Sequence, residues 1–111
     1  MEMEKYQEEA LRIRDLYREF ENKNVGRAWS NEEIFIGLVS DIGDMSRLIL
    51  AKEGARKIEN LEMKMEHEIS DCLWALLVLA KNYDIDLEKA FFENMKGLKD
   101  RINGDMKNFS I

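Results

Sequence analysis

An unbroken run of eight apolar residues, at positions 73–80, constrains the fold of this chain most strongly. A helix that is hydrophobic on all sides must be enclosed, so we expect this segment at the centre of the fold. Glu68 and Asp71 lead into the run, and on a helix their side chains share one face with Ala75. Acidic side chains are almost never fully buried unless they are paired or bind a metal ion. These two acids therefore need an electrostatic partner.

A second pair of acids, Asp41 and Asp44, has the same spacing inside another largely apolar stretch. If two antiparallel helices carry these pairs, four carboxylates meet. Two unit charges about 4 Å apart repel by roughly 4 kcal/mol at an effective dielectric constant of about 20. A hard divalent cation removes this repulsion, and carboxylate oxygens suit Mg²⁺ or Mn²⁺. The spacing leaves two interpretations open: the four acids form a metal site, or each pair lies on an ordinary solvated helix face.

The lack of proline among the 111 residues favours long, uninterrupted helices. Apolar periodicity predicts four helices, at residues 2–23, 31–53 and 61–83 and from residue 87 to a break at Asn103-Gly104. Short links between helices are typical of antiparallel bundles. We therefore expect an all-α protein, an antiparallel four-helix bundle formed by a single domain over residues 1–111.

Local signals mark the ends of these helices. Ser30 and Glu33 have the spacing of a capping box, and Gly54 is typical of a helix C-terminus. Asn60 and Asp86 are the expected N-caps of the third and fourth helices.

The predicted helices carry more apolar surface than one four-helix layer can cover. The first helix has one seam, formed by Met3, Tyr6, Ala10, Ile13, Tyr17 and Phe20. The second has two apolar sides, formed by Ile34, Leu38, Met45 and Leu48 and by Phe35, Val39, Ile42 and Ile49. The fourth has one stripe, formed by Leu87, Phe91, Met95, Leu98 and Ile102. The surplus favours a homodimer or a larger homo-oligomer, such as a homotetramer.

Other features narrow the function. The net charge is −6 and the basic residues form no run, which argues against binding to a nucleic-acid backbone. No apolar stretch reaches the roughly 18 residues of a membrane span, and the N-terminus lacks the features of a signal peptide, so we expect a cytoplasmic protein.

Cys72 is the single cysteine and fits a small core residue. Trp29 either packs over a helix end or covers a bound ligand.

Three stretches together carry a resemblance to a known family. They are Leu38-Val-Ser-Asp-Ile-Gly-Asp44, Glu68-Ile-Ser-Asp-Cys-Leu-Trp-Ala-Leu-Leu-Val-Leu-Ala80 and Ile85-Asp-Leu-Glu-Lys-Ala90. Over residues 34–98 the chain resembles the MazG-like family of all-α nucleoside triphosphate pyrophosphohydrolases. The 23 residues between the acidic pairs, 45–67, also suit that family.

The resemblance implies an activity and a set of ligands. The family hydrolyses a nucleoside or deoxynucleoside triphosphate to the monophosphate and pyrophosphate, with Mg²⁺ held by four acids. Carried over to this chain, the metal ligands are Asp41, Asp44, Glu68 and Asp71.

The chain also departs from the family pattern. Its first acidic pair is Asp/Asp where the family usually has Glu/Glu, and Ser40, His67 and Arg47 stand where further acids are common. His67 could transfer protons or be an exposed polar residue. Asn94 and Lys96 are the nearest candidates for the family's phosphate-contacting residues on the last helix.

These departures leave three alternatives open. The chain could be a nucleotide- or metal-binding helical module of the same fold without turnover. It could be a phosphoribosyl-ATP pyrophosphohydrolase, whose motif spacing matches less well. It could also be a structural helical oligomer whose acids are ordinary.

Overall fold

The computed structural model describes residues 2–109. Within that range it contains four α-helices and no strand: α1 (Glu2–Asn24), α2 (Asn31–Lys52), α3 (Leu61–Asn82) and α4 (Leu87–Phe109). This confirms the all-α class, and the first three predicted helices agree with the observed ones to within one residue at each end.

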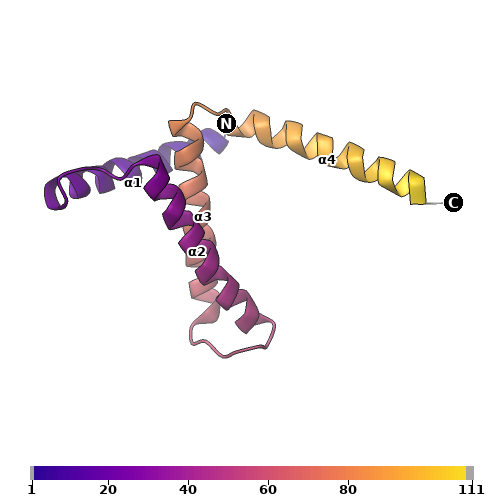
Figure 1. Cartoon of the computed structure of the whole chain (residues 1–111), viewed down its shortest axis with the longest axis horizontal. Coiled ribbons are helices and arrows are strands. Elements are labelled where there is room, and N and C mark those ends of the chain that lie inside the picture. Colours follow the sequence, from indigo (N-terminus) through magenta and orange to yellow (C-terminus); the bar gives the residue numbers. More distant parts are fainter. Residues whose placement is uncertain (1, 110–111) are drawn as a thin grey trace.

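α2 and α3 form an antiparallel hairpin that holds most of the core (Figure 1). Asn82 Nδ2 donates to Asn31 Oδ1 over 2.8 Å at the open end of the hairpin, and Lys52 pairs with Glu62 near the α2–α3 loop. The buried cluster consists of Ala10, Ile34, Leu38, Cys72, Ala75, Leu77 and Val78. The apolar run of α3 is therefore central, as predicted, and Val78 is fully buried.

Part of that apolar run nevertheless faces outward. Leu73 and Leu76 are each about half exposed in the single chain, and Phe35, Val39 and Ile42 on α2 are exposed to the same degree. The sides of α2 and α3 that carry these residues are thus not covered by any described part of the chain.

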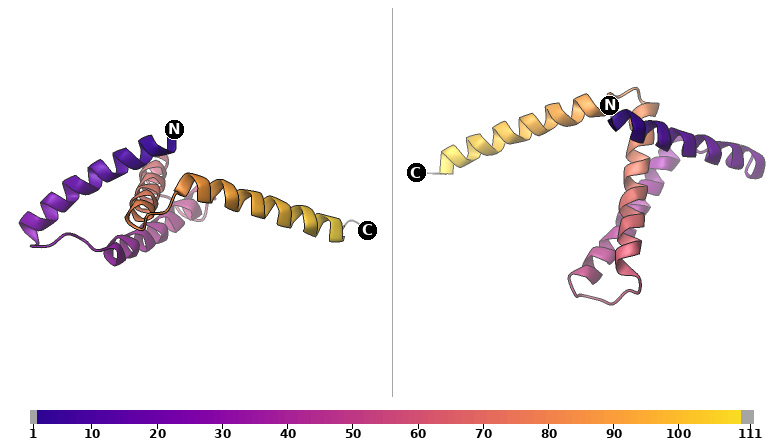
Figure 2. Two further views of the ribbon diagram at one scale, coloured as in Figure 1. Left: turned by 90° about the horizontal axis from the view of Figure 1, so that it is seen from above. Right: turned by 180° about the vertical axis from the view of Figure 1, so that it is seen from behind.

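α1 packs against α3 near the open end of the hairpin (Figure 2). The indole Nε1 of Trp74 donates to the carbonyl oxygen of Ala10 over 3.0 Å, which fixes the two helices against each other. The predicted seam of α1 is only partly buried, because Tyr6, Tyr17 and Phe20 are all more than half exposed.

A buried ion pair connects the end of α1 to the segment before α2. Arg14 Nη1 donates to both carboxylate oxygens of Glu21 over 3.0 and 3.1 Å, and its Nη2 donates to the carbonyl oxygen of Trp29 over 2.9 Å. The backbone N–H of Trp29 donates to Glu21 Oε1 over 2.7 Å. Both charged residues are buried although they lie outside the predicted apolar seam of α1: Arg14 is 2% exposed and Glu21 is 8% exposed.

Most of the predicted helix caps are confirmed. The Ser30 hydroxyl accepts from the backbone N–H of Glu33, and the Glu33 carboxylate accepts from the N–H of Ser30, so the capping box is complete. A hydrogen bond from Arg27 and the one from Ser30 lower the pKa of Glu33 to about 2. Asp86 accepts from the N–H of Lys89 at the start of α4.

Two cap residues show left-handed backbone geometry. Gly54 has a φ of +92° just beyond α2, as expected of a helix C-terminus. Asn60 holds the N-cap position of α3, as predicted, with a φ of 55° and without a hydrogen bond from its side chain to the helix.

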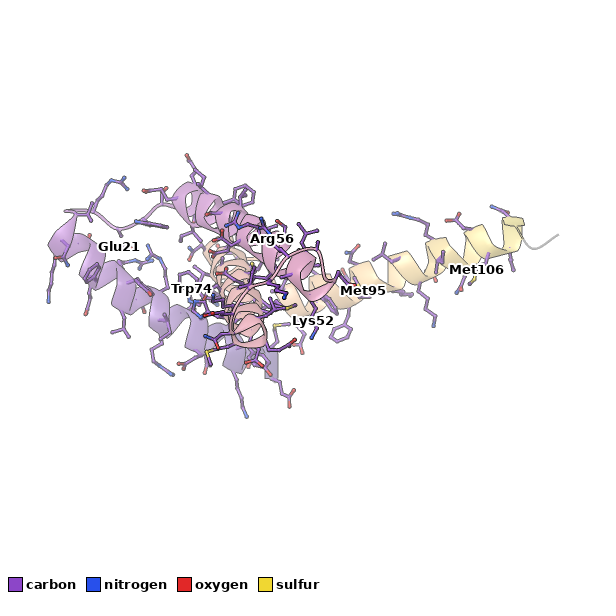
Figure 3. All side chains as sticks on the ribbon, turned by 90° about the horizontal axis from the view of Figure 1, so that it is seen from below. Glu21, Lys52, Arg56, Trp74, Met95 and Met106 are labelled. Carbon is purple, nitrogen blue, oxygen red and sulfur yellow. The ribbon has the colours of Figure 1, made fainter. Side chains whose placement is uncertain are left out.

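α4 differs from expectation in length and in position. Asn103-Gly104 does not end it, since the helix continues to Phe109. A glycine costs a helix only about 1 kcal/mol relative to alanine, and no proline follows. α4 extends away from the other three helices, and Figure 3 shows the side chains of Met95 and Met106 on it.

The described part of a single chain therefore does not close into a four-helix bundle. Its radius of gyration is 18.2 Å, whereas a compact domain of this length has about 13 Å. Among the described residues, no helix has the length and apolar character needed to span a membrane.

We predict that Arg14→Ala lowers the free energy of unfolding by about 3–5 kcal/mol, because it leaves the Glu21 carboxylate buried without its counter-charge. Urea unfolding at one fixed protein concentration measures the change. Arg18→Ala is the matched control, since Arg18 is exposed on the same helix and pairs with Asp15 over 3.7 Å. It should change stability by no more than about 0.5 kcal/mol. Equal stability of the two variants would contradict a structural role for the buried pair.

Candidate functional site

The α2–α3 hairpin brings three of the predicted acids together. One carboxylate oxygen from each of Asp41, Asp44 and Glu68 lies within 4.8 Å of the other two. Asp41 and Asp44 share a face of α2 because they are three residues apart, and the antiparallel register places that face opposite Glu68. All three side chains are partly buried.

The electrostatics of this group are unfavourable without a cation. Burial raises the pKa of Asp41, and the charges of Asp71 and Asp44 raise it further. Burial is also the main cause of the raised pKa of Glu68, and Asp41, Asp44 and Asp71 add to it. Within the described part of the chain, Glu68 Oε2 is buried and has no hydrogen-bond partner.

This donor set fits a hard divalent cation. Three carboxylates within reach of one another match the oxygen ligands that Mg²⁺ and Mn²⁺ prefer, and a buried oxygen without a hydrogen bond is free to act as a ligand. Asp41, Asp44 and Glu68 are thus able to hold such an ion together.

Asp71, the fourth predicted ligand, lies outside this group of three. Its Oδ2 is 3.1 Å from Nε2 of His67, one helical turn earlier on α3. It is still close enough to raise the pKa of Asp41 and Glu68. Whether Asp71 acts as a ligand stays a prediction.

The residues that depart from the family pattern surround the acids. The guanidinium group of Arg47 contacts the carboxylate of Asp44. The side chain of His67 is 71% exposed and has Asp71 as its partner. The thiol of Cys72 is buried, as expected of a core residue, and burial raises its pKa.

The two candidates on the last helix are not close to the acids. Asn94 and Lys96 lie exposed on α4, which extends away from the hairpin (Figure 1). The structure does not bring them to the acidic group of the same chain, so their role in phosphate binding also stays a prediction.

A cavity of about 550 Å³ opens directly beside the acids, between α1, the connector before α2 and the hairpin. Asp41 and Asp71 form its border with the acidic group, and the aromatic rings of Tyr17, Trp29 and Trp74 line it. The rings of Tyr17 and Trp74 have centroids 6.0 Å apart. The aromatic lining and the acidic group are therefore adjacent.

The cavity was not predicted from the sequence. Trp29 does pack against α2, since a Cβ atom added to Gly37 would lie 3.5 Å from Cζ3 of its ring. It also lines the cavity, so packing and ligand contact are not exclusive. Tyr17 belonged to the predicted seam of α1, and its incomplete packing against α3 leaves room for the cavity.

Comparison with known proteins agrees with this geometry. The family model described as the MazG nucleotide pyrophosphohydrolase domain matches residues 42–104. The matched range includes Asp44, Glu68 and Asp71, and it begins one residue after Asp41. Searches of curated proteins and of solved structures gave no match. Because the family model covers more than half of the chain, the protein belongs to the MazG nucleotide pyrophosphohydrolase domain family.

Proposed function

We propose that this protein is a cytoplasmic, Mg²⁺- or Mn²⁺-dependent pyrophosphohydrolase that converts a nucleoside or deoxynucleoside triphosphate to the monophosphate and pyrophosphate. The observation that carries the proposal is the group formed by Asp41, Asp44 and Glu68, within 4.8 Å of one another, in a chain of this family. The unpartnered Oε2 of Glu68 supports it independently.

In this proposal, the carboxylates of Asp41, Asp44 and Glu68 hold the cation, and Asp71 is the fourth ligand. When bound, the cation supplies Lewis acidity toward phosphate oxygens and water. Without it, the acids would repel the triphosphate, so binding of the anionic substrate depends on the cation.

The cavity beside the acids is where we place the nucleoside. Tyr17, Trp29 and Trp74 offer aromatic surface to a base, and Ser40 and Ser70 offer hydroxyl groups at its rim. A nucleoside triphosphate whose base and sugar lie in this cavity would have its α-phosphate beside Asp41 and Asp71. The oxygen of a water molecule then bonds to the α-phosphorus, and the water loses a proton to the solvent. The bond from that phosphorus to the bridging oxygen breaks, and pyrophosphate leaves with the electron pair.

We further propose that the protein acts as a homodimer or a larger homo-oligomer. Leu87, at the start of the α4 stripe, packs against the core, but the stripe is exposed beyond it, with Phe91 at 47%, Leu98 at 42% and Ile102 at 53%. The outer sides of α2 and α3 are exposed as well, and α4 and α2 have nearly equal lengths of 23 and 22 residues. Two copies could therefore cover each other's apolar sides, and a homotetramer would use the same kind of contact.

A non-catalytic module is the second candidate. The contact between Arg47 and Asp44 favours it, because a guanidinium group bound to a metal ligand competes with the cation. Such a module would bind nucleotide with metal but release no product.

Magnesium at millimolar concentration should raise the melting temperature, because an ion that binds only the folded state adds about 2.7 kcal/mol at 100 times its Kd. Asp41→Asn should melt higher than the wild type without metal, since it removes one repelling charge, and should lose the metal-dependent shift. Asp15→Asn is the matched control on the exposed Asp15–Arg18 pair and should keep the shift. The same shift in both variants would argue against a site at Asp41.

With Mg²⁺ or Mn²⁺, a panel of nucleoside triphosphates should yield pyrophosphate. Glu68→Gln and Asp71→Asn should each abolish turnover without changing helicity measured by circular dichroism, because they remove a ligand charge but little volume. Asp41→Glu should be tolerated, since it restores the family's usual side chain. Orthophosphate as the sole product would refute the reaction. Metal-dependent nucleotide binding without any turnover would favour the non-catalytic module.

Light scattering at micromolar concentration should give at least twice the mass of one chain. Leu98→Lys should shift the protein toward the monomer, because it places a charge on the apolar stripe of α4. Asp100→Lys introduces the same side chain at an exposed polar position of α4 and should leave the mass unchanged. A wild-type protein that is a stable monomer would contradict the oligomer.

A further inference from the structure

Arg47 lies on α2 one helical turn beyond Asp44, on the same face of the helix. Its Nη2 donates to Oδ1 of Asp44, and its side chain is 57% exposed. A guanidinium group has five N–H donors in a rigid fork. The contact with Asp44 orients the group and leaves other donors open to a ligand.

The cavity, the acids and Arg47 follow one another along the hairpin. On α2, Gly37 and Leu38 line the cavity, Asp41 and Asp44 belong to the acidic group, and Arg47 comes last. From Gly37 to Arg47 the helix rises about 15 Å. On the antiparallel α3, Trp74 and Asp71 lie at the cavity, and Glu68 lies one turn further toward the loop.

This order sets the direction in which an extended substrate would lie along the hairpin. A nucleoside triphosphate whose base and sugar lie in the cavity places its α-phosphate at the acids, so its β- and γ-phosphates continue away from the cavity. Arg47 is the positively charged side chain of α2 on that side of the acids, before the end of the helix is reached at Lys52. An arginine fork also matches the oxygens of a phosphate, to which it donates two parallel hydrogen bonds.

We propose that Arg47 contacts the β- and γ-phosphates and stabilises the pyrophosphate as it leaves. This inference rests on the proposed function. When the bond between the α-phosphorus and the bridging oxygen breaks, the electron pair stays on the pyrophosphate, and the nearby guanidinium group neutralises that charge where it forms. Arg47 is thus a substrate-contacting residue, and Asp44 both belongs to the metal site and orients it.

The competing interpretation is that Arg47 forms only a surface ion pair. Exposed pairs of this kind contribute about 0–1 kcal/mol to stability, so Arg47 can be replaced without unfolding the protein. The two interpretations make the same prediction for binding of Mg²⁺ and differ for binding of pyrophosphate. Loss of Arg47 relieves competition for Asp44 in either case, whereas only a phosphate-contacting arginine is needed to bind pyrophosphate.

The test is Arg47→Gln, studied by isothermal titration calorimetry with two probes. Mg²⁺ alone should bind about two- to fivefold more tightly than to the wild type, since a competing charge is gone. Inorganic pyrophosphate, titrated at saturating Mg²⁺, should bind about tenfold more weakly or worse, because a charged hydrogen bond is lost. The turnover number should also fall about tenfold or more, and Arg47→Lys should recover part of both losses.

Arg18→Gln is the matched control. Arg18 also follows an aspartate by three residues on an exposed helix face, at Asp15 on α1, and it does not line the cavity. It should leave both affinities and the turnover number unchanged. If Arg47→Gln binds pyrophosphate as tightly as Arg18→Gln while the wild type is active, the role of Arg47 is refuted and the proposed function stands. If the wild type itself neither binds Mg²⁺ nor cleaves any nucleotide, the proposed function fails and this inference fails with it.

Discussion

The carboxylates of Asp41, Asp44 and Glu68 are held together against their own repulsion by the apolar contact between α2 and α3. Burial raises the pKa of Asp41 and of Glu68, so the folded chain binds these two protons more tightly than the unfolded chain does. Protonation of these two acids therefore adds to the free energy of unfolding at low pH. This stabilisation is lost as the pH rises through the raised pKa values of the folded chain. At neutral pH without a cation, the ionised carboxylates of Asp41 and Glu68 therefore lower the free energy of unfolding.

The hairpin, α1 and the connector before α2 each contribute to the site. The buried side chains of the run at residues 73–80 supply the apolar contact that holds α3 against α2. The buried pair of Arg14 and Glu21 fixes α1 and the connector through Trp29, and this connection forms one wall of the cavity. The site therefore depends on elements far from the acids in sequence, and the register of the hairpin aligns cavity, acids and Arg47 in one line.

The sequence predicted the features that are set by residues close to one another along the chain. Periodicity gave the helices, Ser30 and Glu33 gave the capping box, and the three-residue spacing gave the faces that carry the acids. It did not predict the cavity, because its walls depend on where α1 crosses α3 and on charged residues that are buried rather than solvated. It also did not predict the direction of α4. An apolar stripe indicates that a helix face is buried, but it does not show whether the same chain or a second chain packs against that face. Asp71 shows the same limit, because spacing places it on the right face but does not settle whether it contacts the other acids or His67.

Hydrolysis in water enriched in ¹⁸O tests the central claim most directly, because it reports which phosphorus atom the water attacks. The account predicts that, with Mg²⁺ present, one ¹⁸O atom per turnover enters the nucleoside monophosphate and none enters the pyrophosphate. It also predicts that chelation of the metal stops the incorporation. Label in the pyrophosphate or in orthophosphate, or equal incorporation without metal, would contradict a metal-dependent attack at the α-phosphorus.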